Sequence, residues 1–333
     1  MRSFESRCAL RALGVLLLML TWPSSASAQE QAQGFDLERL YTSAPGAGWL
    51  VMDSLDMHGG LGGAVNLVTS YARNPLRVTD GTHHLTVVSD EAFLQLGAAA
   101  TYGRFRFYLT LDSPIIVRGN SGTVGAYTFS PSSFDPSSSP DAISHGRVGF
   151  DARALGGSAS PFRLGLGGQI WFPGGAPGSL RNGYLSDGPP GNGLGAYNAM
   201  VRVLFAGDAR FLTYAGHLGF HLRALDDSPT PGSPQGNEML FGAAAGAKLT
   251  QCDACNTRLV IGPEIFGATA TRSFFGVNST AFEGLVTGRI EGTADDRPQL
   301  RFKLGLGGGL NPHFGAPEAR VVLAVELFQQ SSK

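Results

Sequence analysis

Hydrophobic and polar residues alternate along residues 145–172. In the first half of this stretch, Val148 and Phe150 fall on one face, and Arg147 and Asp151 fall on the other. The alternation stops at a Gly-Gly-Ser sequence and then resumes. A period of two residues predicts β-strands, and the glycine-rich break between them predicts a hairpin.

Each arm of this hairpin keeps its alternation for about ten residues, which matches the roughly 9 to 11 residues that a tilted strand needs to cross a bilayer. One face is apolar, while the other mixes arginine, aspartate and glutamine with glycine. Lipid outside and a polar lumen inside explain this division. A soluble β-sandwich with its apolar face in a core explains a single hairpin equally well.

The rest of the chain favours the membrane interpretation. Similar segments recur from residue 62 to residue 328 and number about twelve, an even count. Their connections alternate in length: 156–160, 207–210 and 251–256 are short, whereas 74–90, 118–144 and 173–195 are long. In a soluble β-sandwich, nothing requires short and long loops to alternate from one strand to the next. We therefore predict an all-β fold, a transmembrane antiparallel up-and-down β-barrel of about 12 strands, closed by pairing of the strand ending at Phe328 with the strand beginning near Ala64.

Composition agrees with this fold class. Hydrophobic residues make up 43% of the chain and charged residues 15%, and the formal net charge of −1 gives no case for a nucleic-acid partner. The N-terminus carries arginines, an apolar run over 13–20 and the sequence Ala26-Ser27-Ala28 before Gln29, which is typical of a secretory signal peptide. After it, no uninterrupted run of about 18 apolar residues occurs, which excludes membrane-spanning helices.

These patterns predict four parts: a signal peptide over 1–28, a segment over 29–61 that is periplasmic or packed at the barrel base, the barrel over 62–328, and a tail over 329–333. The apolar stretch 49–57 fits either a strand or an extended segment. If the long connections lie outside the cell, both termini lie in the periplasm, and the protein lies in the outer membrane of a Gram-negative bacterium.

The polar faces of the predicted strands carry ionisable residues throughout. The predicted lumen-lining residues are Arg106, Asp112, Arg147, Asp151, Arg153, Arg163, Arg202, His217, His221, Arg223, Glu238, Lys248, Glu264, Glu283, Arg289, Arg301, Lys303, Arg320 and Glu326. Basic residues are in excess. They either pair with carboxylates across a narrow lumen or line a wet pore, and a barrel of this size allows both.

Few residues suggest catalysis or cofactor binding. No nucleophile elbow, zinc-protease motif or phosphate loop occurs in a suitable setting. His217 and His221 share an inward face, but the sequence places no serine to pair with them. We predict no enzyme activity, no cofactor and no metal. Cys252 and Cys255 fall in a predicted periplasmic turn, where an oxidising compartment favours a small local disulfide.

Several stretches, in their order and spacing, resemble the β-barrel part of OmpA-like outer-membrane proteins. They are Phe35–Arg39, Trp49–Leu55, Gly149–Arg153, Gln169–Gly174, Gly262–Glu264 and Gly308–Pro317. The resemblance covers most of the mature chain and implies an outer-membrane barrel. Members of that group often carry a C-terminal peptidoglycan-binding domain. This chain ends shortly after Phe328, so we do not expect a wall-anchoring role.

Together these features predict a monomeric outer-membrane barrel that acts as a narrow passive pore or as a structural barrel. Its expected partners are outer-membrane lipid and small solutes or ions. The alternatives are a solute-specific uptake channel and, with less support, a barrel-embedded hydrolase.

Overall fold

The computed structural model describes residues 30–32, 34–131, 145–174, 184–185, 187, 197–223, 225, 235–252, 257–292, 297–311 and 314–329. All regular elements within these ranges are β-strands. No helix in this part of the chain is long and apolar enough to cross a membrane. The predicted signal peptide lies outside the described residues.

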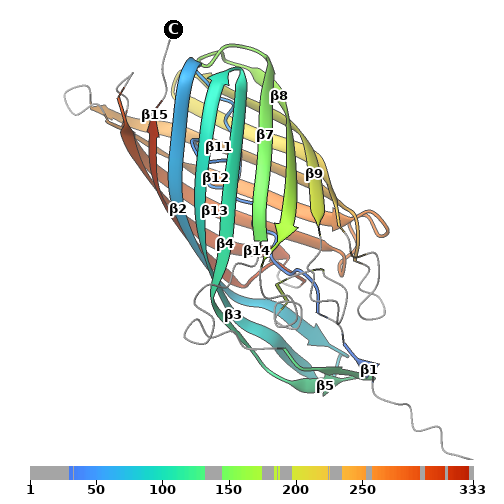
Figure 1. Ribbon diagram of the computed structural model, residues 1–333. Coiled ribbons are helices and arrows are strands. Elements are labelled where there is room, and N and C mark those ends of the chain that lie inside the picture. Colours follow the sequence, from blue (N-terminus) through green and yellow to red (C-terminus); the bar gives the residue numbers. More distant parts are fainter. Residues whose placement is uncertain are drawn as a thin grey trace, which may run out of the picture. The chain divides into compact units, whose positions relative to one another are not determined.

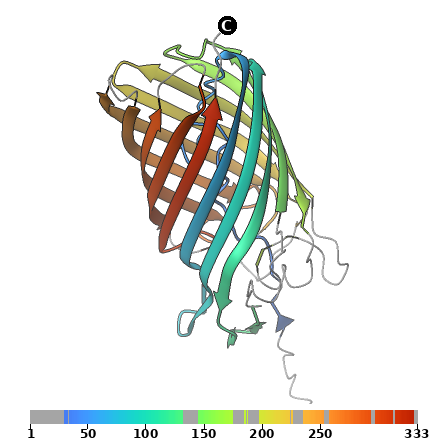
Figure 2. The ribbon, with the colours of Figure 1, turned by 60° about the vertical axis from the view of Figure 1, so that its left-hand side comes forward.

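Twelve antiparallel strands form a closed barrel (Figure 1, Figure 2). They are β2 (Gly59–Thr79), β3 (His84–Gly103), β4 (Phe105–Gly119), β7 (His145–Leu155), β8 (Arg163–Pro173), β9 (Asn198–Ala209), β10 (Leu212–Leu222), β11 (Glu238–Cys252), β12 (Thr257–Ala270), β13 (Thr280–Gly292), β14 (Gln299–Asn311) and β15 (Ala319–Gln329). The last strand pairs with the first, with Phe328 opposite Ala64. The predicted fold class and strand number are confirmed, and closure leaves no sheet edge without a partner.

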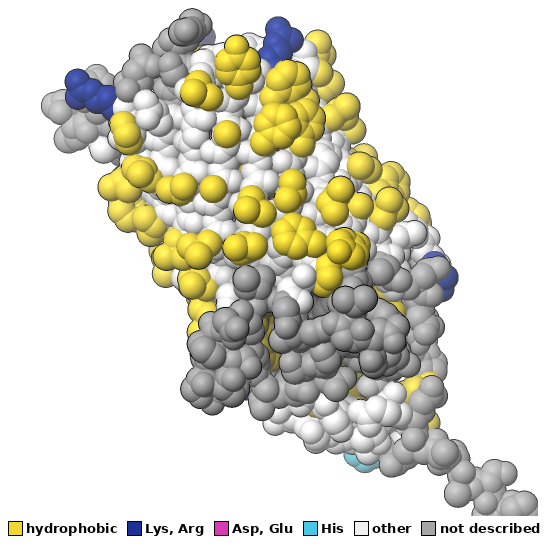
Figure 3. Space-filling model, in the orientation of Figure 1, with side chains coloured by type: hydrophobic (Ala, Val, Ile, Leu, Met, Phe, Trp, Pro, Cys, Tyr) yellow, Lys and Arg dark blue, Asp and Glu magenta, His cyan; other side chains and the backbone are white. Residues whose placement is uncertain are grey.

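The outer face of the barrel is apolar over the middle of the strands. Leu166, Val203, Val286 and Leu323 are exposed there, each on a different strand. In Figure 3, hydrophobic side chains spread over this wall, while lysine and arginine appear only at its margins. Exposed aromatic residues lie next to the turns at one end (Tyr102, Phe105, Phe162, Phe211) and next to the connections at the other (Tyr197, Phe274, Phe275). An apolar band between two aromatic girdles is the surface that a barrel presents to a bilayer.

The two ends of the barrel differ. At the short-turn end, β3 and β4 are joined at Arg104, and β2 begins at Gly59, opposite Gly103. At the long-connection end, β2, β3 and β4 extend further, and the connection after β4 forms β5 (Gly122–Val124) and β6 (Tyr127–Phe129). These two strands make a small sheet with β1 (Glu30–Gln31).

The chain before β2 passes through the barrel. Ala32 donates a backbone hydrogen bond to Thr128 of β6 at 2.9 Å, so the first described residues lie at the long-connection end. The final strand ends at Gln329 beside Gly63, at the short-turn end (Figure 1). The first and the last described residues therefore lie at opposite ends of the barrel. The N-terminus that remains after the predicted signal peptide, which we expected in the periplasm with the C-terminus, lies outside the described residues. Residues 34–58, which we call the lumen segment, connect the two ends.

Candidate functional site

The lumen segment fills the middle of the barrel. The sequence suggested a barrel strand or a segment packed at the barrel base. In the structure the segment instead lies inside the barrel. Trp49, Met52, Leu55 and Met57 are fully buried and form a core with inward side chains of the wall, such as Leu204. A barrel of about eight strands is already filled by its own side chains, so a wider one needs additional material to exclude water. The lumen segment supplies that material.

Inward-facing glycines of the wall make room for this core. A Cβ atom added to Gly246 of β11 would lie 2.6 Å from the Trp49 ring. One added to Gly305 of β14 would lie 2.5 Å from a methyl group of Leu50. Both contacts are too close for any side chain at these positions. The glycines on the polar faces of the strands are thus sockets for apolar side chains of the lumen segment.

Glu264 on β12 anchors the tip of the segment. Its carboxylate accepts backbone N–H groups from Leu50 at 2.9 Å, Val51 at 2.9 Å and Met52 at 3.3 Å. All of these atoms are buried, and these residues belong to no ladder that could satisfy their N–H groups. A buried carboxylate that receives converging donors stabilises both itself and the loop.

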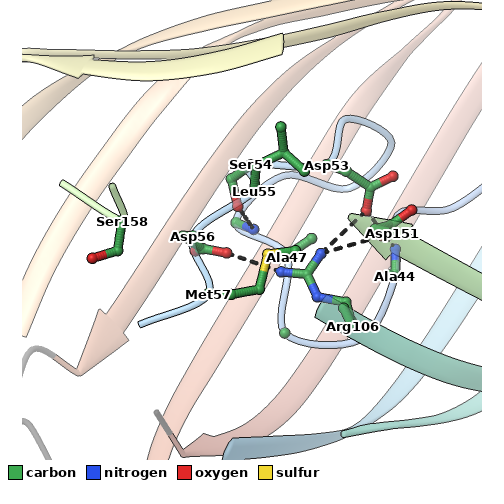
Figure 4. Close-up of polar contacts among 12 residues, drawn as sticks. Ala44, Ala47, Asp53, Ser54, Leu55, Asp56, Met57, Arg106, Asp151 and Ser158 are labelled. Atoms are coloured by element: carbon green, nitrogen blue, oxygen red, sulfur yellow. Dashed lines mark hydrogen bonds and ion pairs between the residues drawn. The ribbon is translucent and has the colours of Figure 1, made fainter. Parts of the chain in front are cut away.

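A cluster of charges holds the segment beside β4, β7 and β9. Arg106 lies 3.0 Å from Asp56 and 3.6 Å from both Asp53 and Asp151. Arg202 contacts Asp53 at 2.9 Å. Figure 4 shows Arg106 reaching from the wall into the loop of the lumen segment, with the aspartates around its guanidinium. Because these side chains are buried, each charge depends on its partners for compensation.

Other wall cations bind carbonyl oxygens of the segment. Arg153 donates to Leu55 at 3.0 Å and to Met57 at 2.6 Å. Lys303 donates to Ala47 at 2.5 Å and to Trp49 at 3.1 Å. These bonds come from opposite walls, β7 and β14, and so fix the segment across the lumen.

The segment is also anchored near the long-connection end. Arg39 pairs with Glu238 at 2.8 Å, and Arg223 bridges Glu238 and Asp187. Burial alone would raise the pKa of Asp187, but the Arg223 guanidinium that donates to it brings this pKa below its ordinary value. The backbone N–H of Asp36 also donates to Asp187 at 2.9 Å. The carboxylate therefore stays charged and links a connection outside the barrel to the lumen segment.

Two cavities lie on either side of this filled region. One, of about 70 Å³, lies toward the long-connection end among Asp36, Tyr41 and Arg147. The other, of about 480 Å³, lies at the short-turn end beneath Ser54 and Asp56. The lumen segment separates them.

The predicted lumen-lining residues lie on the inner side of the wall. All are buried except Asp112 and Lys248, which are half-buried. Many of them contact the lumen segment rather than one another. These contacts could not be predicted, because the segment has no regular hydrophobic period. Four charged residues of the segment itself were not predicted as lumen residues: Glu38, Arg39, Asp53 and Asp56. Their only sequence signal is that carboxylates and an arginine interrupt an otherwise apolar stretch.

His217 and His221 have different neighbours in the structure. His221 lies 3.0 Å from the Tyr41 hydroxyl and 3.6 Å from Glu238, while His217 lies on the side of Arg202 and Asp53. Among the described residues, no serine hydroxyl is hydrogen-bonded to either imidazole. Cys255 lies outside the described residues, so the disulfide with Cys252 stays a prediction.

The sockets lead to a first prediction. Gly246→Val will push Trp49 from its site, because the added side chain occupies the space of the indole ring. We expect a red shift of Trp49 fluorescence in a Trp171→Phe background and a loss of about 1–3 kcal/mol of stability. Gly288→Val on the outer face, where a Cβ would meet its nearest neighbour at 3.9 Å, is the matched control and should leave the spectrum unchanged. Equal spectra for both variants would contradict the socket.

Comparisons with known proteins add little. No protein-family model matches the sequence, and no curated protein matches it. Among solved structures, the NanC porin is similar over 80% of this chain and 99% of its own, with 7% identity and a TM-score of 0.44. The CymD monoaromatic hydrocarbon channel is similar over 84% and 90%, with 9% identity and a TM-score of 0.40. LpxR from Salmonella typhimurium is similar over 79% and 99%, with 11% identity and a TM-score of 0.40. These similarities are too weak to transfer a function.

The molecule's own structure is sufficient to assign its class. The sheet is closed, its outer face is apolar between aromatic girdles, and its inner face is polar and charged. Outer-membrane-type barrels combine these properties. The chain is an outer-membrane β-barrel whose lumen is occupied by its own N-terminal segment.

Proposed function

We propose that this barrel is a passive pore for small solutes or ions that the lumen segment closes. The observation that carries the proposal is the path of residues 34–58, which enter at the long-connection end and leave at Gly59. Between these points the segment is held by side-chain contacts with the wall. Its displacement would join the two cavities into one path across the membrane.

The wall contacts suit a closure that can be released. They are charged hydrogen bonds from separate strands, such as those of Arg153, Glu264 and Lys303, and each can break without a change in the barrel strands. A purely structural barrel is the alternative, and the filled lumen favours it as long as the segment never moves. The two functions differ in whether weakening the contacts produces conductance.

Single-channel recording in planar bilayers tests this proposal. Arg153→Gln removes the guanidinium that binds Leu55 and Met57, and we expect it to increase the frequency of conducting steps at least about tenfold, since charged hydrogen bonds contribute about 1.5–3 kcal/mol each. Arg104→Gln is the control, because Arg104 is exposed at the same end and, within the described ranges, its side chain donates to the wall carbonyl of Ala154 and not to the lumen segment. Silence of both variants would favour the structural barrel.

Further parts of the proposal concern orientation and assembly. We place the long connections outside the cell and Gln329 in the periplasm, and we take the barrel to be a monomer without enzymatic activity. The resemblance to OmpA-like proteins belongs to this proposal and rests on the sequence stretches alone. A solute-specific uptake channel is the second candidate, and it is supported by the charged cavity at the short-turn end.

A further inference from the structure

In the cavity at the short-turn end, which we call the vestibule, lysine and arginine residues outnumber carboxylates among the lining residues. The six lysine and arginine residues on its wall are Arg163, Arg210, Lys248, Arg258, Arg289 and Arg301. Among the described residues, three carboxylates, those of Asp56, Asp208 and Glu291, line it with them. The vestibule has a volume of about 480 Å³, within the range of small-molecule sites.

The carboxylates of the vestibule are shared among several cations. Glu291 contacts Arg258 at 2.6 Å, Arg301 at 2.6 Å and Arg289 at 3.5 Å. Asp208 contacts Arg163 at 2.8 Å and Lys248 at 2.6 Å in the same way. Arg301 also pairs with Glu326, which lies outside the vestibule, at 2.5 Å. Glu291 and Asp208 still cannot neutralise all of the other cations, so positive charge remains on the described part of the wall.

Two cations are not fully paired. Arg289 is 5% exposed and lines the vestibule; its Nε lies 3.5 Å from Glu291, and neither Nε nor Nη1, both buried, has a hydrogen-bond partner among the described residues. Arg210 stands exposed at the rim and makes no ion pair in the part of the chain that the structure describes. Burying a guanidinium with unused donors is costly unless an anion completes its contacts.

We propose that the vestibule binds a small oxyanion, either a phosphate or a carboxylate, between Arg289 and the cations of the rim. Guanidinium groups match both anions because their N–H donors bind two oxygens at once. This proposal names the class of solute for the proposed pore. Transport of the anion rests on the proposed function, because it requires that the barrel conduct. Binding itself requires no conductance.

Trp49 provides a built-in reporter. The Arg289 guanidinium lies 5.0 Å from the centre of the Trp49 ring, so a bound anion would change the charge next to the indole. In a Trp171→Phe background, inorganic phosphate should change Trp49 fluorescence saturably at ionic strength held constant with sodium chloride. Equilibrium dialysis of the same full-length protein measures phosphate binding independently of fluorescence.

Two variants locate the site. Arg289→Gln should weaken phosphate binding at least about tenfold, because it removes buried donors. Arg210→Gln removes an exposed cation without leaving a buried charge unpaired, so it should fold normally and weaken binding up to about fivefold. Arg104→Gln removes a cation at the same end but outside the vestibule and should leave binding within about twofold of the parent.

Dialysis with acetate in place of phosphate tells a carboxylate site from a phosphate site. The proposal is overturned if the parent protein binds neither inorganic phosphate nor acetate saturably, or if Arg104→Gln weakens binding as much as Arg210→Gln. Phosphate binding together with silence of the Arg153→Gln variant in bilayers would support the vestibule and refute the pore. Conductance by a protein that binds no anion in dialysis would support the pore and refute the anion site in the vestibule.

Discussion

Glu264→Gln will lower the free energy of unfolding of the barrel by about 3 kcal/mol. The wild-type carboxylate accepts N–H groups from Leu50, Val51 and Met52, and it is fully buried. The amide of glutamine keeps one acceptor oxygen but turns an NH₂ group toward these donors. At least one buried N–H then loses its partner, and two donors face each other.

Urea unfolding of the protein in lipid vesicles, followed through Trp49 fluorescence, measures this loss. Glu318→Gln is a matched control: the carboxylate of Glu318 pairs with Arg77 at 2.6 Å, but both side chains are about one-third exposed. An exposed ion pair contributes at most about 1 kcal/mol. If the two variants lose the same stability, Glu264 does not anchor the lumen segment as the structure indicates.

Leu323→Arg will cost about 2–4 kcal/mol of folding free energy, because it places a charge on the lipid face near the middle of β15. Leu323 is 48% exposed and lies opposite Leu304 of β14 and Thr69 of β2. Leu304 has no hydrogen-bond acceptor in its side chain, and Thr69 offers a neutral hydroxyl that does not compensate the charge of the guanidinium. The cationic head group must therefore either reach the interface or remain in hydrocarbon.

Leu327→Arg is the matched control for this substitution. Leu327 lies on the same face of the same strand, is 44% exposed, and stands near the short-turn end, where the charge reaches the interface. The expected cost there is about 0–1 kcal/mol. Urea unfolding in vesicles compares the two variants. Equal costs at both depths would show that β15 does not present this face to a bilayer.

The barrel could be predicted from the sequence because its signal is local. Each strand repeats a period of two, so Val203 and Arg202 fall on opposite faces whatever the partner strand is. Closure followed from the cost of an open edge in lipid, and the pairing of Phe328 with Ala64 confirms it. Strand ends were less predictable: β2 and β3 extend beyond the expected span, and β3 contacts β5 of the small sheet.

The lumen segment could not be predicted in the same way. It has no regular period, and its position depends on sockets at Gly246 and Gly305 that are far away in the sequence. A glycine on a strand's polar face looks the same whether it faces water or an indole ring. The sequence could therefore place Arg153 and Glu264 in the lumen, but it could not show that they bind the backbone of residues 50–57.

The inward charges illustrate the same limit. The sequence allowed pairing across the lumen or a wet pore. In the structure, some charges pair between wall strands, as Arg320 does with Glu283 at 2.7 Å. Others, such as Arg106, bind carboxylates of the lumen segment. Which of these occurs depends on a chain segment whose course the alternation pattern does not specify.

Closure of the pore by the lumen segment is tested most directly by replacing residues 42–56 with a Gly-Ser linker of equal length. The replacement removes Trp49, Met52 and Leu55 while leaving every barrel strand unchanged. Single-channel recording in planar bilayers should then show large, lasting conductance steps, whereas the wild-type protein stays closed for most of the record. A replacement variant that folds as a heat-resistant barrel in detergent and conducts no more than the wild type would show that the segment does not close a pore.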